Sequence, residues 1–383
     1  MIIGYDGKRA FQNKTGLGNY SRSLLSILNR YFPALQYTLF APKKTNLFDI
    51  NSYINFRTIQ PQNFFYKKLP ALWRRIGIVK QIDLANLDIY HGLSNELPRG
   101  IEKLNIKTVV TIHDLIFERF PKTYHFDERY THRWKIKRAC KIADAVIAIS
   151  EQTKNDLIDF YKVSPQKITV CYQSCNPIFE KKISEIEKNN VKKKYQLPDQ
   201  FFLFVSSITA RKNLIAVCRA MIILKDIVNI PLVIIGDGKI EKDEVKQLMK
   251  ENGMEQRLFF LNELAAAKEE CFTTAADFPA IYQQALALVY PSIFEGFGLP
   301  ILEAMWSELP VICSSVSSMP EVAEDAALYF SPHDTIQLAQ HLQAFVSDEK
   351  LVTILKEKGQ MQAKKFSTEN YANQIIKVYK SLK

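Results

Sequence analysis

The sequence lacks the features that mark membrane-spanning or exported proteins. No apolar run among its 383 residues approaches the ~20 residues of a spanning helix. The first residues, Met-Ile-Ile-Gly-Tyr-Asp, are typical of a buried strand and not of a signal peptide. We therefore expect a protein that is made and kept in the cytoplasm.

Cysteine is present, but in no pattern that binds metal or builds a disulfide framework. None of the six cysteines belongs to a Cys-x-x-Cys pair, and their spacing fits neither a zinc site nor a small disulfide-rich fold. Several lie among apolar residues, which is typical of core thiols in a reducing compartment. The six are Cys140, Cys171, Cys175, Cys218, Cys271 and Cys313.

Internal repeats and low-complexity tracts are also absent, which favours ordinary globular domains. At roughly 150 residues per domain, the length suggests two of them. Short β-branched runs alternate with helical periodicity, and this alternation predicts an α/β fold with parallel sheets. Nine runs are predicted as strands: Met1–Tyr5, Tyr37–Ala41, Asp88–His91, Lys107–Ile112, Ala145–Ile149, Phe201–Ser206, Pro231–Ile235, Ala287–Tyr290 and Pro310–Cys313.

Charge is distributed unevenly along the chain. Residues 1–200 carry 33 Lys and Arg against 18 Asp and Glu, whereas residues 201–383 carry 18 against 22. A basic half is expected to meet something anionic, such as nucleic acid, an anionic membrane surface or a phosphorylated substrate. A composition shift over Asn176–Gln200, from a polar stretch to the apolar Phe201–Val205, places the domain junction between these halves.

The most informative segment is Tyr290-Pro-Ser-Ile-Phe-Glu-Gly-Phe-Gly-Leu-Pro-Ile-Leu-Glu-Ala-Met305. A strand ends at its start, and a helix is predicted to begin near Pro300, since proline is favoured in a first turn. Gly296 and Gly298 allow the backbone to approach a ligand, and the helix presents unpaired N–H groups to an anion. Two carboxylates, Glu295 and Glu303, can accept hydrogen bonds from sugar hydroxyls. The predicted ligand contacts are Glu295, Gly296, Phe297, Gly298, Leu299 and Glu303.

This segment resembles the Glu-x7-Glu signature of the retaining GT-B glycosyltransferases of family four, which includes bacterial mannosyltransferases. The resemblance extends over most of the chain. It implies that Glu303 binds the nucleotide ribose and that Glu295 contacts the donor sugar. It also implies a GT-B fold, in which two doubly wound Rossmann-like domains face each other across a cleft and a C-terminal helix crosses back to the first domain.

The domains expected on this basis are an acceptor-binding domain and a donor-binding domain. The first comprises residues 1–180 together with about 366–383. The second comprises residues 181–365 and binds the nucleotide sugar.

The Arg211-Lys212 pair follows the apolar strand of the second half and resembles a basic pair in the same family. Fixed cations in a dry cleft stabilise the charge that develops on a departing diphosphate. The chain contains no Asp-x-Asp, the pattern with which metal-dependent glycosyltransferases hold a divalent cation. We therefore expect neither a metal nor another cofactor, and we expect Arg211 and Lys212 to be both binding and catalytic residues.

Three segments of the basic half also resemble the family. Gly16 and Gly18 lie in a glycine-rich loop, Thr15-Gly-Leu-Gly-Asn-Tyr20, whose amides face the donor phosphate in the family. His113 follows a buried strand and corresponds to a histidine beside the donor sugar, so it is a predicted catalytic residue. His91 ends another strand and is a candidate for the acceptor side. Ser150 is read as the N-cap of a helix.

The sequence says less about the identity of the donor and the acceptor than about the type of reaction. Overall likeness to mannosyltransferases suggests mannose from GDP-mannose, moved to a glycan or lipid-linked acceptor in surface polysaccharide or glycoconjugate synthesis. Retention is expected to follow a front-face path, since no carboxylate nucleophile can be named. Glu308, Glu324 and Asn262 stand where many family members have glycine, and these departures bear on the preference for the nucleobase.

A segment that mixes aromatic residues and cations, Phe64–Lys80, resembles an interfacial element, and a second basic cluster covers Arg129–Lys141. Both predict peripheral binding to an anionic membrane at the inner face. A helix with a solvated basic face is an open alternative.

Other classes of protein fit the sequence less well. A nucleic-acid-binding protein is suggested by the pI of about 9.1, but no helix-turn-helix, zinc or single-strand-binding signature appears, and we expect no nucleic acid partner. A dehydrogenase is disfavoured because Ser21 replaces the third glycine of Gly-x-Gly-x-x-Gly. A sugar-nucleotide epimerase or a phosphorylase with the same fold is the closest alternative.

Overall fold

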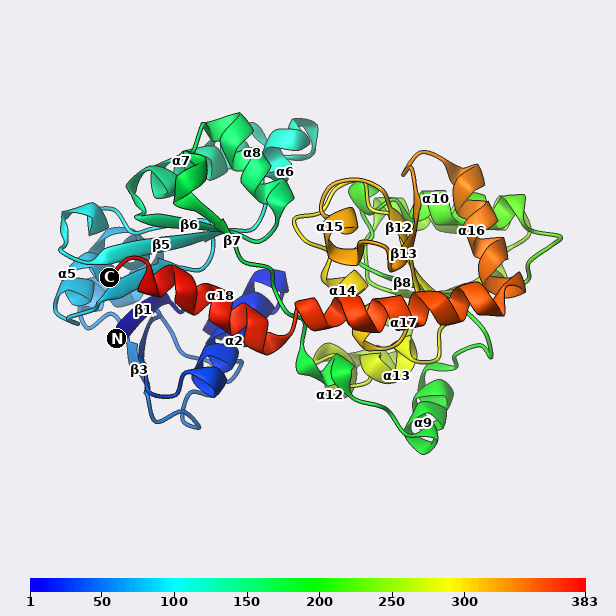
Figure 1. Cartoon of the computed structure of the whole chain (residues 1–383), viewed down its shortest axis with the longest axis horizontal. Coiled ribbons are helices and arrows are strands. Elements are labelled where there is room, and N and C mark those ends of the chain that lie inside the picture. Colours follow the sequence, from blue (N-terminus) through cyan, green and yellow to red (C-terminus); the bar gives the residue numbers. More distant parts are fainter. The chain divides into compact units, whose positions relative to one another are not determined.

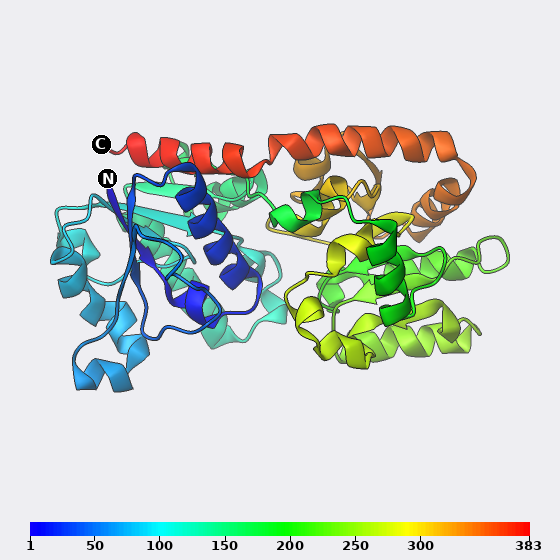
Figure 2. The same ribbon diagram turned by 90° about the horizontal axis from the view of Figure 1, so that it is seen from below.

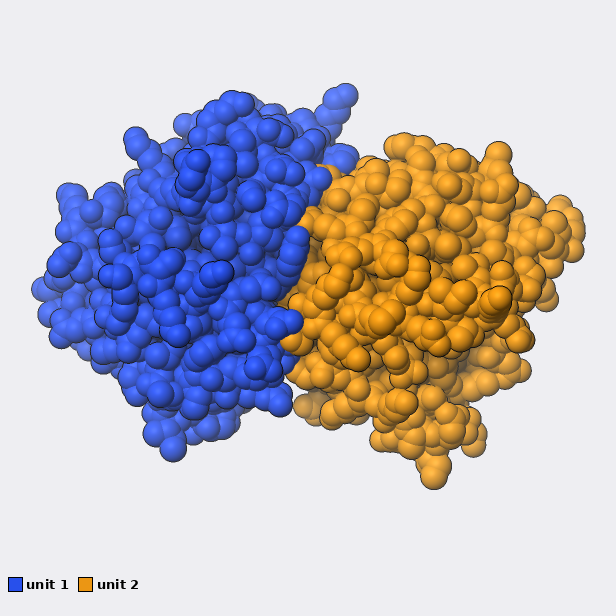
Figure 3. Space-filling model, in the orientation of Figure 1, with its two compact units in different colours: residues 1–172, 368–383 blue, residues 173–367 orange.

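The computed structural model describes residues 1–383 and divides the chain into two compact units (Figure 3). Unit 1 comprises Met1–Tyr172 and Thr368–Lys383, and unit 2 comprises Gln173–Ser367. Unit 1 holds 30 Lys and Arg against 15 Asp and Glu, and unit 2 holds 21 against 25. Within the structure no helix has the length and apolar character required to span a bilayer.

Unit 1 is built on a parallel sheet of seven strands in the order β3-β2-β1-β4-β5-β6-β7 (Figure 1). Its interior strands are continuous apolar runs because helices cover both faces of the sheet. The strands are β1 (Ile2–Asp6), β2 (Gln36–Phe40), β3 (Phe56–Ile59), β4 (Ile89–Gly92), β5 (Lys107–Ile112), β6 (Ala145–Ala148) and β7 (Ile168–Val170).

Helices α2 and α18 cover one face of this sheet, and α5, α7 and α8 contribute to the core on the other. The C-terminal helix α18 packs against α2, so both chain ends belong to unit 1 (Figure 2). The helices are α1 (Lys8–Gln12), α2 (Gly16–Tyr31), α3 (Phe64–Lys68), α4 (Pro70–Leu72), the π-helical turn η1 (Trp73–Gly77), α5 (Ile78–Asp83), α6 (Ile116–Arg119), α7 (Phe126–Ile142), α8 (Glu151–Tyr161) and α18 (Thr368–Lys380). Ser150 caps α8, as expected, because its side chain accepts a hydrogen bond from the Thr153 amide.

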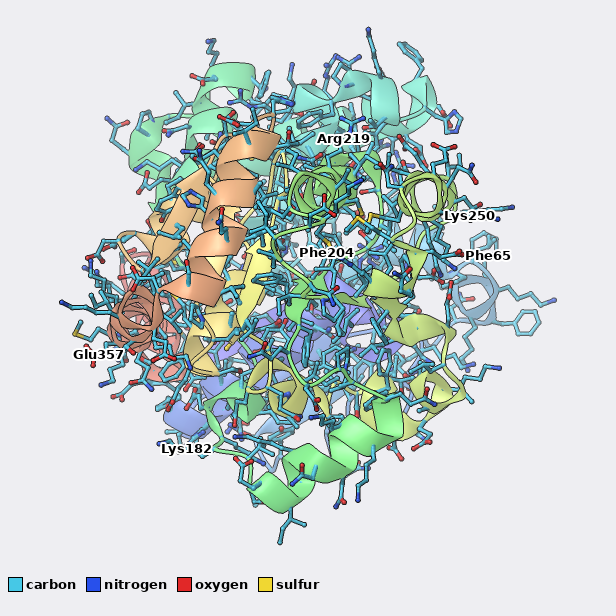
Figure 4. The ribbon with its side chains drawn as sticks, turned by 90° about the vertical axis from the view of Figure 1, so that its right-hand side faces the viewer. Phe65, Lys182, Phe204, Arg219, Lys250 and Glu357 are labelled. Carbon is cyan, nitrogen blue, oxygen red and sulfur yellow. The ribbon has the colours of Figure 1, made fainter.

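Unit 2 has a parallel sheet of six strands in the order β10-β9-β8-β11-β12-β13. Its core lies between this sheet and the helices α10, α11 and α16, with Phe204 of β8 fully buried in it (Figure 4). The strands are β8 (Phe202–Val205), β9 (Leu232–Ile235), β10 (Leu258–Phe260), β11 (Ala287–Tyr290), β12 (Val311–Ser314) and β13 (Ala327–Phe330). The helices are α9 (Glu185–Tyr195), α10 (Leu214–Ile223), α11 (Ile240–Glu251), α12 (Glu270–Thr273), α13 (Phe278–Tyr282), α14 (Leu299–Trp306), α15 (Met319–Ala323), α16 (Thr335–Ser347) and α17 (Glu349–Lys365).

The polar stretch at the expected domain junction is itself ordered. The units divide after Tyr172, and the residues that follow form helix α9 of unit 2. Ser184 and Glu187 form a capping box at the start of this helix, in which each side chain bonds the backbone of the other residue. The composition shift therefore marks an exposed helix with a strong N-terminal cap rather than a linker.

Candidate active site

The candidate site of unit 2 lies at the carboxyl ends of β8 and β11. These strands are parallel neighbours, so the loops that follow them leave the same edge of the sheet. The loop after β8 leads through the 3-10 turn Ala210–Lys212 into α10, and the loop after β11 leads through residues 291–298 into α14. Topology thus brings together two segments that are about eighty residues apart in the chain.

Arg211, Lys212 and Glu295 form one ion cluster between these loops. The Lys212 Nζ lies 2.5 Å from the Glu295 Oε1, and an Arg211 NH1 lies 3.3 Å from the Oε2. Arg211 also donates to the Phe294 carbonyl. Burial alone would raise the pKa of the Glu295 carboxyl, but the charges of Lys212 and Arg211 outweigh it and lower the pKa below its usual value. The cluster is therefore ionised at neutral pH, with one cation in excess.

The loops are held by side chains to which sequence reasoning gave no role. Asn213, in the left-handed conformation at φ 57°, donates through Nδ2 to the carbonyls of Pro291 and Pro332 and so ties three loops together. Ser317 and Ser318 donate their hydroxyls to the Glu295 carbonyl. Asn213 follows the Arg-Lys pair directly, and the serines follow strand β12, so position after a strand was the available signal.

Backbone amides beside the ion cluster are left without an acceptor. Gly298 is the N-cap of α14 and adopts φ 109°, which an L side chain rarely does, so glycine is required here. The N–H groups of Gly296, Gly298 and Leu299 make no hydrogen bond within the protein. Together with the positive end of the helix dipole, they form a cradle for an anion.

Phe297 belongs to the same loop but serves the core. Its side chain is 3% exposed and packs edge-on against Phe366, with the ring centroids 5.8 Å apart. Its carbonyl accepts a hydrogen bond from the Ser318 hydroxyl. The predicted ligand contact of Phe297 is therefore confined to its backbone.

Glu303 lies on α14, one turn beyond the amide cradle. Its Oε2 accepts a hydrogen bond of 2.8 Å from the Tyr282 hydroxyl. Burial raises the pKa of the Glu303 carboxyl to about 7, against the opposing effect of the Tyr282 hydrogen bond. At neutral pH this group is thus divided between its charged and neutral forms, unlike the ionised Glu295.

In unit 1 the two predicted loop glycines have different environments. A Cβ on Gly18 would lie 1.9 Å from the Asn13 carbonyl oxygen, whereas a Cβ on Gly16 would meet nothing within 4 Å. The Gly18 amide donates to the Thr15 carbonyl and to the Asn13 side chain. The Gly18 amide is therefore engaged within the protein, and the close contact with Asn13 leaves no room for a side chain at this position; its binding to a donor phosphate stays a prediction. Gly16, the first residue of α2, makes no such bond.

His113 follows β5 and is 7% exposed. Its Nε2 lies 2.8 Å from the Leu93 carbonyl oxygen, which can only accept, so the proton resides on Nε2 and Nδ1 is left as an acceptor. Its ring packs edge-on against Tyr20 of α2 at 4.4 Å, which links it to the glycine loop. Burial lowers the pKa of His113 to about 4, so the imidazole is neutral at physiological pH.

His91 does not line a surface, contrary to the sequence expectation. It is fully buried, and its Nδ1 and Nε2 bond the Tyr379 hydroxyl at 2.6 Å and the Thr111 hydroxyl at 2.8 Å. The Tyr379 hydroxyl lies 3.2 Å from that of Tyr5. His91 therefore fastens the C-terminal helix α18 to the sheet of unit 1, since Tyr379 belongs to that helix.

Three residues replace a glycine that is common in the family, and two of them adopt a backbone conformation that is strained for a residue with a side chain. Glu308 and Glu324 adopt φ values of 57° and 44°, the region in which glycine is preferred. Asn262 is different, because its side chain accepts a hydrogen bond of 2.7 Å from the Gly236 amide. That amide is therefore occupied by the protein itself.

Comparison with known proteins assigns the chain to a family. Residues 185–362 match the model of the glycosyl transferases group 1, and residues 23–177 match that of glycosyltransferase family 4. The chain is 31% identical over 298 residues to the O-antigen chain mannosyltransferase B of Escherichia coli, which covers 77% of this chain and 74% of the relative.

Solved structures agree on the fold. The sucrose-phosphate synthase from Thermosynechococcus elongatus superimposes with a TM-score of 0.75 at 20% identity over 100% of this chain and 99% of its own. Anabaena HepE in complex with UDP gives 0.73 at 16% identity, over 99% of each chain. Both neighbours confirm the predicted pair of Rossmann-like domains of the GT-B type. The chain belongs to the glycosyltransferases of family 4, and it is a hexosyltransferase.

Proposed function

We propose that this glycosyltransferase moves mannose from GDP-mannose to a glycan or lipid-linked acceptor in surface polysaccharide synthesis, with retention of the anomeric configuration. The relative from Escherichia coli is an O-antigen chain mannosyltransferase, which supports both the sugar and the pathway class. The neighbour HepE was solved with UDP and with UDP-glucose, which supports a nucleotide diphosphate sugar as the donor.

The ion cluster of unit 2 carries the proposal. With the amides of Gly296, Gly298 and Leu299, the cations Arg211 and Lys212 form a positive cradle that fits a diphosphate. The Glu295 carboxylate pairs with both cations. A bound diphosphate shares the cations with Glu295 and frees carboxylate oxygens to accept hydrogen bonds from the donor sugar.

Transfer then breaks the bond between the anomeric carbon and the diphosphate oxygen, and the bonding electrons pass to that oxygen. The Lys212 and Arg211 cations stabilise the new charge in a buried setting, where they act more strongly than water does. The acceptor oxygen forms its bond on the same face of the sugar and gives its proton to the departing phosphate. Charge stabilisation by fixed cations requires no divalent ion, so we propose that turnover is independent of metal.

Two further groups, one in each unit, have the chemistry that these steps need. Glu303, on the helix that follows the cradle, is proposed to bind the ribose. In unit 1, His113 offers the unprotonated Nδ1 of a neutral ring, so it is proposed to accept a hydrogen bond from a sugar hydroxyl.

Product analysis with GDP-mannose, UDP-glucose and UDP-galactose tests the donor, and a chelator tests independence of metal. We expect mannose transfer from GDP-mannose that persists in the chelator. Lys212→Met should lower kcat about 10²-fold or more, whereas Lys358→Met, which removes a cation that pairs with Asp325 on the surface of unit 2, should leave it unchanged. Near-normal turnover of Lys212→Met, or activity that disappears with chelator and returns with manganese, contradicts the proposed chemistry.

A further inference from the structure

Five cationic side chains of unit 1 gather where the π-helical turn η1 and the loop after β4 approach helix α7. Three of them are paired with carboxylates: Arg74 with Asp6 and Glu96, Lys135 with Glu96, and Arg138 with Glu102. The other two, Arg75 and Arg99, have no carboxylate within ion-pair distance, although acids are plentiful nearby.

Both unpaired arginines lie over the indole ring of Trp134. Their guanidinium carbons are 5.6 Å (Arg75) and 4.4 Å (Arg99) from the ring centroid. The Arg99 amide donates to the Arg75 carbonyl at 2.7 Å, so the backbone fixes the two residues relative to each other. An aromatic platform limits the freedom of each guanidinium group and leaves its N–H donors available. We call this arrangement the Trp134 clamp (Arg75, Arg99 and Trp134).

The electrostatics of the Trp134 clamp favour an anion. Two like charges on one ring repel each other, and no acidic side chain relieves that repulsion. The pKa of Arg99 is lowered, first by desolvation and then by the charges of Arg75 and Arg138. Guanidinium groups bind phosphate through paired N–H donors, with a geometry that a lysine cannot offer.

The segment that carries Arg75 also exposes large apolar side chains. The exposed fractions are 71% for Phe64, 54% for Phe65, 44% for Leu69 and 46% for Ile76. Figure 4 shows Phe65 on helix α3 with its ring pointing away from the protein. We call these four residues the apolar edge.

The apolar edge and Arg75 of the Trp134 clamp belong to one folded segment, α3 to η1. The Tyr66 ring rests on Gly77, where an added Cβ would lie 2.5 Å from the ring, and this contact holds α3 against η1. Lys68 lies 4.6 Å from the Phe64 ring centroid, so a cation accompanies the exposed aromatic residues as well. Exposed rings beside cations are suited to the boundary between headgroups and acyl chains.

We propose that the Trp134 clamp binds the phosphate of anionic phospholipid headgroups while the apolar edge enters the bilayer interface. This assigns a membrane-binding site to unit 1 that uses none of the residues of the proposed donor site. Binding of this kind is independent of the sugar that the enzyme transfers.

Co-sedimentation with vesicles in the absence of any nucleotide sugar tests the proposal separately from transferase activity. Wild-type protein should bind phosphatidylcholine vesicles that contain phosphatidylglycerol much more tightly than pure phosphatidylcholine, and salt should weaken the binding. Arg75→Gln with Arg99→Gln should reduce the partition coefficient by roughly fivefold for each arginine. Trp134→Leu keeps both charges but removes the platform, and it should also reduce binding.

The matched control is Lys43→Gln with Lys44→Gln, which removes two exposed cations of unit 1 that have no carboxylate partner. This variant should bind within about twofold of wild type, since its cations lie outside the clamp. An equal loss in the control and the arginine variant, or equal wild-type binding to both kinds of vesicle, overturns the proposal. It is also overturned if soluble glycerol phosphate binds with the same dependence on the arginines while vesicles do not.

Discussion

The two units share a layered architecture, but they treat ionisable groups at their strand ends in opposite ways. In unit 1, His113 and the neighbouring His91 are buried and neutral, and both rings are hydrogen-bonded within the protein. In unit 2, Lys212 and Glu295 are buried and charged, and the partly exposed Arg211 adds a second cation, with unpaired amides beside them. A neutral edge suits the hydroxyls of a sugar, and a positive edge suits a diphosphate. The same fold thus provides two different electrostatic environments at its strand ends.

The largest expected difference between the two units is in their stability at acid pH. The folded-state pKa values of His91 and His113, about 3 and 4, lie below the ordinary value of 6.5, so the stability they contribute is present above pH 6.5 and is lost as the pH falls. Each histidine should lower the free energy of unfolding of unit 1 by about 2–3 kcal/mol between pH 6.5 and pH 4.5.

Unit 2 should respond with the opposite sign. The folded-state pKa of Glu303 is raised to about 7, so its contribution is complete below pH 4.5 and is lost as the pH rises through 7. Hydrogen exchange of β4 and β5 against β11 and β12, corrected for intrinsic rates, should show unit 1 opening first in acid. Equal loss of protection in both units contradicts the assignment of neutral histidines.

The buried ion pair between Lys212 and Glu295 should also contribute to the free energy of unfolding. Lys212→Met leaves Glu295 with Arg211 as its remaining partner, which should destabilise the protein by about 3 kcal/mol. Adding Glu295→Gln should recover part of that loss, because the charge that then remains, Arg211, is partly exposed and still donates to the Phe294 carbonyl. Denaturant unfolding measures both variants. Activity should not recover in the double variant, and a double variant as unstable as the single one would argue against the pair.

Nucleotide affinity should depend on pH through Glu303. If the ribose hydroxyls donate to its carboxylate, binding releases a proton, and affinity for GDP should rise roughly tenfold between pH 6 and pH 8. Glu303→Gln should abolish this dependence, and Tyr282→Phe should retain it at a higher midpoint, because the Tyr282 hydrogen bond lowers the pKa. Calorimetric titration in two buffers measures the proton release directly. A flat profile in the wild type excludes this role of Glu303.

The smallest effect is expected at strained backbone positions, one in each unit. Lys162 in unit 1 and Glu308 in unit 2 adopt φ values of 54° and 57°, where glycine avoids the penalty of a side chain. Lys162→Gly and Glu308→Gly should each stabilise the protein by about 0.5–1 kcal/mol. Thermal unfolding checks the direction, and destabilisation by either variant would show that the lost side-chain contact outweighs the strain.

The sequence predicted the interior strands of both sheets, and it did not predict the edge strands. All nine predicted runs correspond to interior strands of the two sheets. The four strands absent from that prediction, β3, β7, β10 and β13, are the four sheet edges. Edge strands are short and partly exposed, as in Phe56–Ile59, where no residue is fully buried. Burial on both faces creates the continuous apolar run on which the prediction relied, and an edge strand lacks it.

The candidate site divides in a similar way. The string from Glu295 to Glu303 and the Arg211-Lys212 pair were found because each follows an apolar strand and precedes a helix. Phe297 and Gly18 were assigned to ligand binding from motifs of the same kind. In the structure the Phe297 ring packs against Phe366, and the Gly18 amide is hydrogen-bonded within the protein. A motif specifies which residues are present, and it does not specify which of their atoms are already engaged.

The sequence by itself determined the α/β class, the interior strands, the residue types of the glycine-rich loop before α14 and the family, because apolar runs and glycine-rich turns are local patterns. Only the tertiary structure decided that Lys212 pairs with Glu295, that His91 fastens α18, and that Arg75 and Arg99 meet on Trp134. These contacts join residues between about 24 and 290 positions apart in the chain. No local pattern encodes them, since they arise where packing and hydrogen bonding bring distant segments together.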